Sequence, residues 1–302
     1  MTEYHFDYEV VHCPLCDSSS FSLFETTVNR GITLHNWICK RCGLVFLSPR
    51  MDVESVEKFY RSKYRVHDIE RDKPIQWVVE KEETRALYQI DLLEDWIGKV
   101  PHRLLDIGAS SGRLLHIATQ KFNCVSVGIE PGDNYRAYAS QNFKLYLNIE
   151  SLIAASEKQF DVITMSHVLE HLDEPIKFLS TLRKYVLQED GVLFIEVPNL
   201  YGHSCFEPAH LYAFTDKTLS MMLRMAGFDI LKVKMHSAPR DFGWRNISIL
   251  ARLSSRSRIK YPRQFVFPPY IKFQRSVGLS GTRHWYGYLF SQTKKFLTMY
   301  DS

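Results

Sequence analysis

The 302-residue sequence lacks several features that mark other classes of protein. No apolar run approaches the roughly 18 residues of a membrane-spanning helix. Internal repeats and low-complexity segments are also missing, and the first ten residues, MTEYHFDYEV, lack the basic and apolar regions of a signal peptide. With 45% hydrophobic and 24% charged residues, we expect a globular, cytosolic protein without a transmembrane segment.

Cysteine is scarce, and its spacing indicates a metal site rather than disulfides. The chain has six cysteines, which in a reducing compartment are poor candidates for disulfide bonds. Two Cys-x-x-Cys pairs are formed by Cys13, Cys16, Cys39 and Cys42. Four thiolates complete a tetrahedral zinc site, so we expect a structural Zn²⁺ there. His12 and His35 are near enough to be rival ligands, and unliganded thiols or a redox pair are the other interpretations.

Acidic residues are scarce near the carboxyl end. Residues 252–302 contain ten Lys or Arg and one acid, Asp301, although the net charge of the whole chain is +4. A basic tail with Tyr, Phe and Trp suits a phosphate-bearing partner such as a nucleotide-sugar, RNA or an anionic membrane surface. A solvated helix and loop packed on the domain is the alternative interpretation.

The pattern divides the chain into four predicted parts. Residues 1–50 form a zinc-binding module, 51–100 a helical connector or lid, 101–253 an alternation of strands and helices, and 254–302 a basic aromatic extension. The third part has the rhythm of an open parallel α/β sheet. Its predicted strands are Leu104–Ile107, Val125–Ile129, Lys144–Leu147, Val162–Met165 and Val192–Val197, followed after the helix Lys217–Met225 by Asp229–Met235 and Ile247–Leu253.

A glycine is missing from the turn after the first predicted strand. In DIGASSG the glycines are Gly108 and Gly112, and Ser110 stands between them. Glycines at positions 1, 3 and 6, as in dinucleotide-binding turns, fit poorly. A turn with glycines at positions 1, 3 and 5 matches twice, and its middle position needs only a small side chain, which Ser provides. Asp106, just before the turn, can bind an ammonium group, and Glu130, after the second strand, can accept both ribose hydroxyls.

Four segments carry a resemblance to a known family. DIGASSGRLL, VGIEP, FDVITMSHVLEHLDEP and DGVLFIEVPN occur in this order and together resemble the class I S-adenosylmethionine-dependent methyltransferase domain, over about residues 100–252. The resemblance implies a seven-stranded, doubly wound, Rossmann-like sheet of order 3-2-1-4-5-7-6 with strand 7 antiparallel. It implies S-adenosylmethionine as cofactor, with Asn148 near its adenine and Ser166 beside it. A helix N-cap is the alternative role for Asn148.

The cysteine pairs narrow the resemblance. CPLC…CKRCGLVFLSPR ahead of these motifs is similar to the amino-terminal zinc module of nucleotide-sugar C-methyltransferases and their relatives in glycan and natural-product pathways. This similarity implies methyl transfer to O or C of a carbohydrate or a related small metabolite. The chain lacks the length for the further carboxyl-terminal domain of that group, and Ala209 replaces the Glu that precedes their catalytic His.

Three residues are candidates for chemistry on the acceptor. His210, in PAHLYAFT, matches the HLxxF[ST] segment of the family and can take the acceptor's proton, with a loop anchor as the alternative. His167 can touch cofactor or acceptor. Tyr64 lies with Tyr60 in an aromatic-basic cluster of the connector that could bind a phosphate or a sugar, with a solvated helix face as the alternative. His167 and His171 are expected on one helical face, which would suit a metal pair, but they lack the H-E-x-x-H pattern.

Two other functions fit parts of the sequence. An rRNA or tRNA methyltransferase can also join a zinc module to this domain, but the cysteine pairs lack strongly basic flanks. The NPPY-type motif of many base-amino methyltransferases is also replaced, by Ser166-His167. A non-catalytic S-adenosylmethionine-binding scaffold is the second alternative, against which the intact set of motifs argues.

Overall fold

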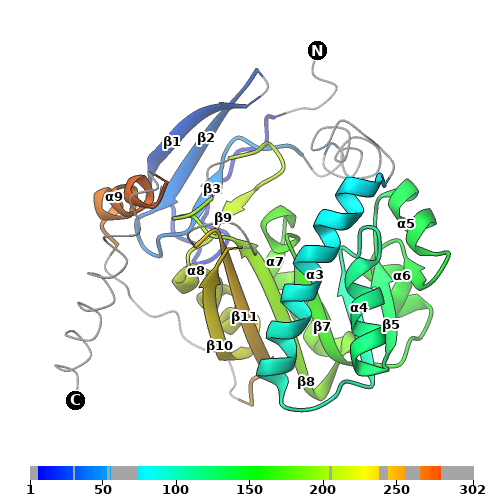
Figure 1. Ribbon diagram of the computed structural model, residues 1–302. Coiled ribbons are helices and arrows are strands. Elements are labelled where there is room, and N and C mark those ends of the chain that lie inside the picture. Colours follow the sequence, from blue (N-terminus) through cyan, green and yellow to red (C-terminus); the bar gives the residue numbers. More distant parts are fainter. Residues whose placement is uncertain are drawn as a thin grey trace.

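The computed structural model describes residues 6–29, 31–52, 55, 74–203, 206–237, 244–255 and 266–279. The described chain forms a seven-stranded and a four-stranded sheet. Figure 1 shows the small sheet above one end of the large one, with helix α9 (Pro268–Leu279) beside it. Of the described helices, none is long and apolar enough to cross a membrane.

The large sheet has the strand order β10-β11-β8-β7-β4-β5-β6. Its strands are β4 (Arg103–Ile107), β5 (Val125–Ile129), β6 (Lys144–Tyr146), β7 (Phe160–Ser166), β8 (Leu187–Pro198), β10 (Phe228–His236) and β11 (Asn246–Leu253). β11 is antiparallel to both β8 and β10, whereas β4 to β8 pair in parallel. Counted along the chain, this is the order 3-2-1-4-5-7-6, so the predicted α/β Rossmann-like methyltransferase sheet is confirmed.

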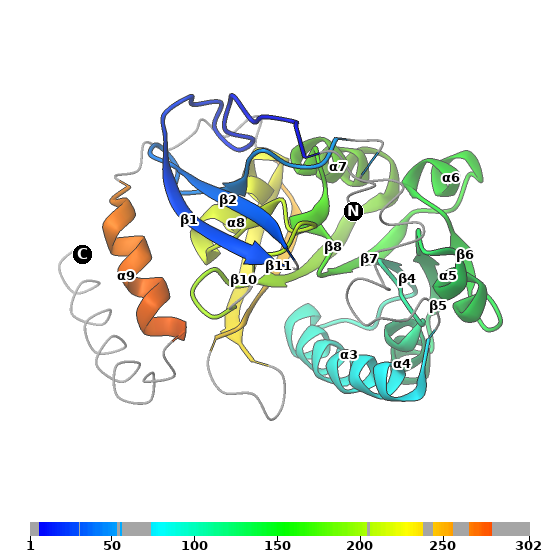
Figure 2. The same cartoon turned by 90° about the horizontal axis from the view of Figure 1, so that it is seen from above.

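Alternate residues of the central strands face two separate hydrophobic cores. Leu104, Val162 and Phe194 pack with helices α3 and α4, while their neighbours Leu105 and Ile163 pack on the opposite face. Figure 2 shows α3 and α4 on one side of the sheet and α7 and α8 on the other. A strand buried on both faces is apolar throughout, which is why these strands were recognisable as short apolar runs.

The helices connect the strands in the doubly wound manner. They are α3 (Gln76–Ile97), α4 (Arg113–Phe122), α5 (Asp133–Ala139), α6 (Ile149–Ala154), α7 (Pro175–Thr181) and α8 (Asp216–Met225), with the short turns η2 (Leu169–His171) and η3 (Leu182–Val186). The helix α3 buries Ala86, Ile90 and Leu93, at helical spacing, against the sheet domain. It ends at Gly98, whose φ of 63° closes the helix in the left-handed conformation.

The small sheet has the order β1-β2-β3-β9. Its strands are β1 (Phe21–Asn29), β2 (Ile32–Cys39), β3 (Val45–Leu47) and β9 (Tyr212–Ala213). The first three lie within residues 1–50, around the cysteine pairs. β9 was not predicted, because two residues are too few for a periodic pattern. It follows β8 in the chain and pairs antiparallel with β3, so the small sheet is joined to the carboxyl end of β8.

Arg50 fastens the small sheet to the large one. Its side chain is buried, donates from Nη1 to the Tyr212 hydroxyl at 3.0 Å and forms an ion pair with Asp173 through Nη2. The Tyr212 hydroxyl in turn donates to the carbonyl of Asp173 at 2.8 Å. Residues from the cysteine segment, the turn before α7 and β9 therefore meet in one hydrogen-bonded group. The division of the chain into four parts stays a prediction.

Candidate active site

The turn between β4 and α4 has a left-handed backbone at three positions. Gly108 and Gly112 both have φ of 80°, and Ser110 has φ of 50°. A Cβ atom at Gly108 would lie 2.5 Å from Cγ2 of Val168, so that position requires glycine. Ser110 stands where the third glycine is missing, and it adopts the conformation that glycine would favour.

Two acids hold Ser110 in this conformation. Its backbone N–H donates to Oε2 of Glu130 at 2.8 Å, and its hydroxyl donates to Oε1 of Glu82, on α3, at 2.6 Å. Glu82 also accepts a hydrogen bond from the Ser111 hydroxyl. The side-chain hydroxyl thus compensates for the strain of a serine with positive φ.

Three carboxylates surround the turn. Asp106, buried at the end of β4, accepts a hydrogen bond from the Thr164 hydroxyl at 2.7 Å. Burial, together with the charges of Glu130 and Glu82, raises the pKa of Asp106 to about 7. Glu130 is also buried and accepts a hydrogen bond from the Gly132 N–H at 2.8 Å. Carboxylates that are close together and removed from water favour a cationic ligand.

A buried polar network lies at the carboxyl end of β7 and β8. Gln89 Nε2, from α3, donates to the Ser166 hydroxyl at 2.7 Å and to Oε1 of Glu196 at 2.8 Å. Oε2 of Glu196 accepts a hydrogen bond from Ser248 at 3.0 Å and lies 3.2 Å from Nε2 of His236. Sequence reasoning missed this network, and the one signal for it was an acid inside the apolar run VLFIEVP of β8.

His167 follows β7 with a strained backbone, φ 54°. Its ring nitrogens lie 3.5 Å from Oε1 of Glu170 and 3.7 Å from Oε1 of Glu196. Burial and the charge of Arg85 disfavour the protonated ring, but the two glutamates outweigh both and raise the pKa of His167. The helix η2 begins only at Leu169, so the prediction that His167 and His171 share a helical face is wrong.

The structure instead brings His171 to His210. Their ring centroids are 4.8 Å apart, and one ligand atom from each, with one from Glu170, lie within 4.8 Å of one another. Glu170, His171 and His210 form what we call the histidine–glutamate cluster. Nδ1 of His171 donates to the carbonyl of Ala209 at 2.8 Å, and the Leu211 N–H donates to the carbonyl of Glu170 at 2.9 Å. These bonds fasten the end of the β8–β9 loop, of which residues 199–203 and 206–211 are described, to η2.

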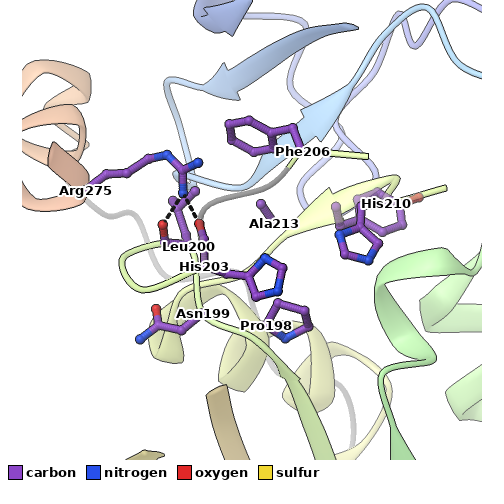
Figure 3. Close-up of a pocket in the computed structure, with 9 residues that line it drawn as sticks. Pro198, Asn199, Leu200, His203, Phe206, His210, Ala213 and Arg275 are labelled. Atoms are coloured by element: carbon purple, nitrogen blue, oxygen red, sulfur yellow. Dashed lines mark hydrogen bonds between the residues drawn. The ribbon is translucent and has the colours of Figure 1, made fainter. Parts of the chain in front are cut away.

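His210 borders a small pocket between this loop and α9, seen in Figure 3. The pocket is lined by Pro198, Asn199, Leu200, His203, Phe206, His210, Tyr212, Ala213 and Arg275. The side chain of His210 is 11% exposed, and its ring centroid lies 6.1 Å from that of His203. Burial, with the charge of His171, lowers the pKa of His210 to about 4, so its ring is neutral at pH 7. Tyr60 and Tyr64 lie outside the described residues.

Arg275 of α9 holds the other side of the loop. Its side chain is buried, donates from Nη1 to the carbonyls of Leu200 and His203, and donates from Nε to Glu25 at 3.1 Å (Figure 3). Its guanidinium also lies 4.4 Å from the ring centroid of Phe206. Part of the basic extension therefore builds the pocket, while residues 256–265 and 280–302 lie outside the description and the phosphate-bearing partner stays a prediction.

Asn148 begins α6 as a helix N-cap. Its side chain accepts a hydrogen bond from the backbone N–H of Ser151 at 2.9 Å, and the Ser151 hydroxyl contacts the Asn148 backbone N–H in return. This reciprocal pair is a capping box. The cap was the alternative role considered for Asn148, and its contact with adenine stays a prediction.

The four paired cysteines form a buried cysteine cluster. Cys13 and Cys42 have their Sγ atoms 3.5 Å apart, as do Cys16 and Cys39, and the four atoms all lie within 4.8 Å of one another. A disulfide requires about 2.05 Å, whereas sulfurs around a tetrahedral Zn²⁺ with Zn–S near 2.3 Å are about 3.8 Å apart. The geometry therefore fits a metal-binding module. His12 and His35 are outside this group and contact Asp17 and Thr26.

Comparison with known proteins identifies the domain. Residues 80–233, which are 154 of the 302 residues, match the methyltransferase domain family. A ubiquinone biosynthesis O-methyltransferase of Neisseria meningitidis is 25% identical over 170 residues, 48% of this chain and 70% of the relative. The enzyme of the same name from Glaesserella parasuis is 30% identical over 163 residues, 49% of this chain and 65% of the relative.

A solved structure supports the fold. The 1,6-didemethyltoxoflavin-N1-methyltransferase of Burkholderia thailandensis, with bound S-adenosylhomocysteine, superimposes with a TM-score of 0.55 at 17% identity, covering 76% of this chain and all of that one. The two O-methyltransferases cover only about half of this chain. Because the family match spans more than half of the sequence, the chain belongs to the methyltransferase domain family and is a class I S-adenosylmethionine-dependent methyltransferase.

Proposed function

We propose that this chain transfers the methyl group of S-adenosylmethionine to a hydroxyl of a small molecule. The observation that carries the proposal is that an acid-lined glycine turn and the pocket beside His210 lie at the carboxyl ends of neighbouring strands, β4, β7 and β8. In this proposal Asp106 binds the ammonium group of the cofactor and Glu130 its ribose hydroxyls. Gly108, Ser110 and Gly112 let the backbone approach the ligand, and Asn148 and Ser166 lie beside it.

Arg85 extends the proposed cofactor site. It lies on α3, three residues after Glu82, and its charge acts on His167 at the end of β7. Within the described part of the chain, no hydrogen bond or ion pair engages its guanidinium. We assign Arg85 to the carboxylate of the cofactor. The methionine part of the cofactor would then be held at both of its charged groups, the carboxylate by Arg85 and the ammonium group by Asp106.

The transfer is an in-line displacement. The acceptor oxygen forms a bond to the methyl carbon, the carbon–sulfur bond breaks, and its electron pair stays on sulfur to give S-adenosylhomocysteine. In the hypothesis from the sequence, the hydroxyl proton passes to His210, which is neutral and borders the pocket. His167 and Tyr64 are the further candidates for contact with the acceptor. The enzyme's remaining task is to hold acceptor and cofactor in line.

The acceptor class is proposed on two grounds. The cysteine segment is similar to that of nucleotide-sugar methyltransferases, which favours a carbohydrate. The two matched relatives are named ubiquinone biosynthesis O-methyltransferases, which favours oxygen as the acceptor atom and makes a hydroxylated ring the alternative. The geometry of the cysteine cluster supports a structural Zn²⁺ on its four thiolates.

The test is S-adenosylhomocysteine release from the full-length protein with matched panels of nucleotide-sugars, glycans, hydroxylated aromatics and RNA. We expect turnover with a hydroxyl-bearing small molecule. Turnover with RNA alone would replace the proposal by the RNA methyltransferase alternative. Calorimetry should show binding of S-adenosylmethionine and none of NAD, and binding without turnover on any panel would favour a scaffold.

A further inference from the structure

We propose that the histidine–glutamate cluster binds a divalent transition-metal ion beside the pocket. Glu170, His171 and His210 offer one carboxylate oxygen and two imidazole nitrogens within 4.8 Å of one another. One carboxylate with two imidazoles is a donor set used for Zn²⁺, Fe²⁺ and related ions. The site is separate from the cysteine cluster, and it leaves coordination positions open.

The carboxylate of Glu170 is the strongest indication. Its side chain is 1% exposed, and among the described residues neither carboxylate oxygen accepts a hydrogen bond. The nearest nitrogens, on His167 and His171, lie 3.5 and 3.8 Å from Oε1, which is ion-pair distance but longer than an ordinary hydrogen bond. Burial opposes ionisation of Glu170, but the neighbouring histidines outweigh it and lower the pKa of Glu170, so the buried group is a carboxylate. A metal cation between it and the imidazoles of His171 and His210 would give its oxygens a direct partner.

The orientation of His171 supports the same ion. A carbonyl oxygen can only accept, so Nδ1 of His171 carries the proton in its bond to Ala209 and Nε2 is turned to Glu170, 3.8 Å away. Nε2 of His171 therefore points toward the carboxylate of Glu170 and is placed to bind an ion shared with it. Metal-bound histidines use the same arrangement, in which the second ring nitrogen donates to a carbonyl. Two ligands about 2.1 Å from one ion can be 3.8 Å apart.

The position of the cluster gives the ion a role. His210 lines the pocket, so a cation there can bind an acceptor hydroxyl and lower its pKa, with the proton released to solvent. This role rests on the proposed function, whereas the binding of the ion does not. His210 would then act as a ligand and the cation would replace it in handling the proton.

Cobalt titration of the zinc-loaded protein tests the proposal. Protein dialysed to one zinc per chain is titrated with Co²⁺ by calorimetry, and zinc and cobalt are then measured by elemental analysis. We expect one cobalt per chain with the zinc retained. Glu170→Gln and His210→Ala should each weaken Co²⁺ binding by about 100-fold. Glu174→Gln is the matched control, because this exposed glutamate follows η2 in the same segment and pairs with Lys177.

Three results would overturn the inference: no cobalt beyond the zinc equivalent, equal binding by wild type and both variants, or an equal loss in Glu174→Gln. They would leave His171 as a side chain that only fastens the loop to η2. If Glu170→Gln does not fold, His210→Ala decides, since His210 lies on a loop. Calorimetry with S-adenosylmethionine on the same zinc-only protein tests the proposed function separately. If S-adenosylmethionine does not bind, the proposed function is contradicted, but the cobalt result is unaffected.

Discussion

The proposed cofactor side and the proposed acceptor side of this active site are built differently. The cofactor side comes from consecutive strand ends, with Asp106, the turn 108–112 and Glu130 all within a short length of sequence. The acceptor side joins segments far apart in the chain: Arg50, the η2 turn, the β8–β9 loop and α9. Under the proposed function, cofactor recognition is local, whereas acceptor recognition depends on the assembly of the whole molecule. Mutations should therefore affect cofactor binding and acceptor turnover separately.

The largest difference between acceptor turnover and cofactor binding should come from a substitution in the cysteine cluster. Cys39→Ser removes one of four proposed zinc ligands, and structural zinc contributes roughly 10 kcal/mol or more to modules of this kind. We expect loss of zinc by elemental analysis and early proteolysis within β1 to β3. Turnover should also be lost, because β3 pairs with β9, which borders the pocket. Binding of S-adenosylmethionine should persist. Cys124→Ser, a buried cysteine outside the cluster, should change none of these, and an equal defect there would contradict the prediction.

His210→Ala should lower turnover without changing cofactor binding. As base or as metal ligand, His210 acts on the acceptor, so turnover should fall by about 10² to 10⁴ while cofactor affinity stays within about twofold of wild type. Steady-state kinetics and calorimetry measure the two quantities. The exposed His102, immediately before β4, supplies the control His102→Ala. Wild-type turnover of His210→Ala would reduce His210 to an anchor of its loop.

Glu130→Ala should break the cofactor side. The variant leaves ribose hydroxyls and the Ser110 N–H without their acceptor, which should weaken S-adenosylmethionine by about 1 to 3 kcal/mol. Calorimetry gives the affinity directly. The exposed Glu150 on α6 provides the matched control Glu150→Ala, which should bind like wild type. Unchanged affinity in Glu130→Ala would remove it from the cofactor site.

The smallest effect is a pH dependence of cofactor binding. The pKa of Asp106 is about 7 in the free protein, above its ordinary value of 3.8, so at pH 6 most molecules must lose a proton before binding an ammonium group. The dissociation constant should be roughly tenfold higher at pH 6 than at pH 8, and Asp106→Asn should abolish this slope. Because the pKa of Asp106 is higher in the folded than in the unfolded protein, the protonated side chain adds to the free energy of unfolding below about pH 4. This contribution is lost as the pH rises through about 7. A flat profile in the wild type would rule out Asp106 as the titrating group.

The short-range pattern of apolar strands and turns predicted an open α/β sheet, and the resemblance to class I methyltransferases supplied its strand order and the antiparallel strand. The sequence did not predict that Ser110 would have positive φ and be held by Glu82, since that contact joins α3 to the turn. β9 and Arg275 were missed because a two-residue strand and a single arginine carry no periodic signal. The pairing of His171 with His210, rather than with His167, depends on the path of the β8–β9 loop.

The two-residue strand β9 also bears on how such an enzyme can diversify. β9 is the edge strand of the small sheet, whose other strands belong to the cysteine segment. A replacement of that segment in evolution would therefore change the strand with which β9 pairs, and with it the position of the β8–β9 loop. The residues around the glycine turn would be untouched. If the proposed site is right, an exchange of this peripheral part would change the acceptor and leave the methyl donor and its geometry as they are.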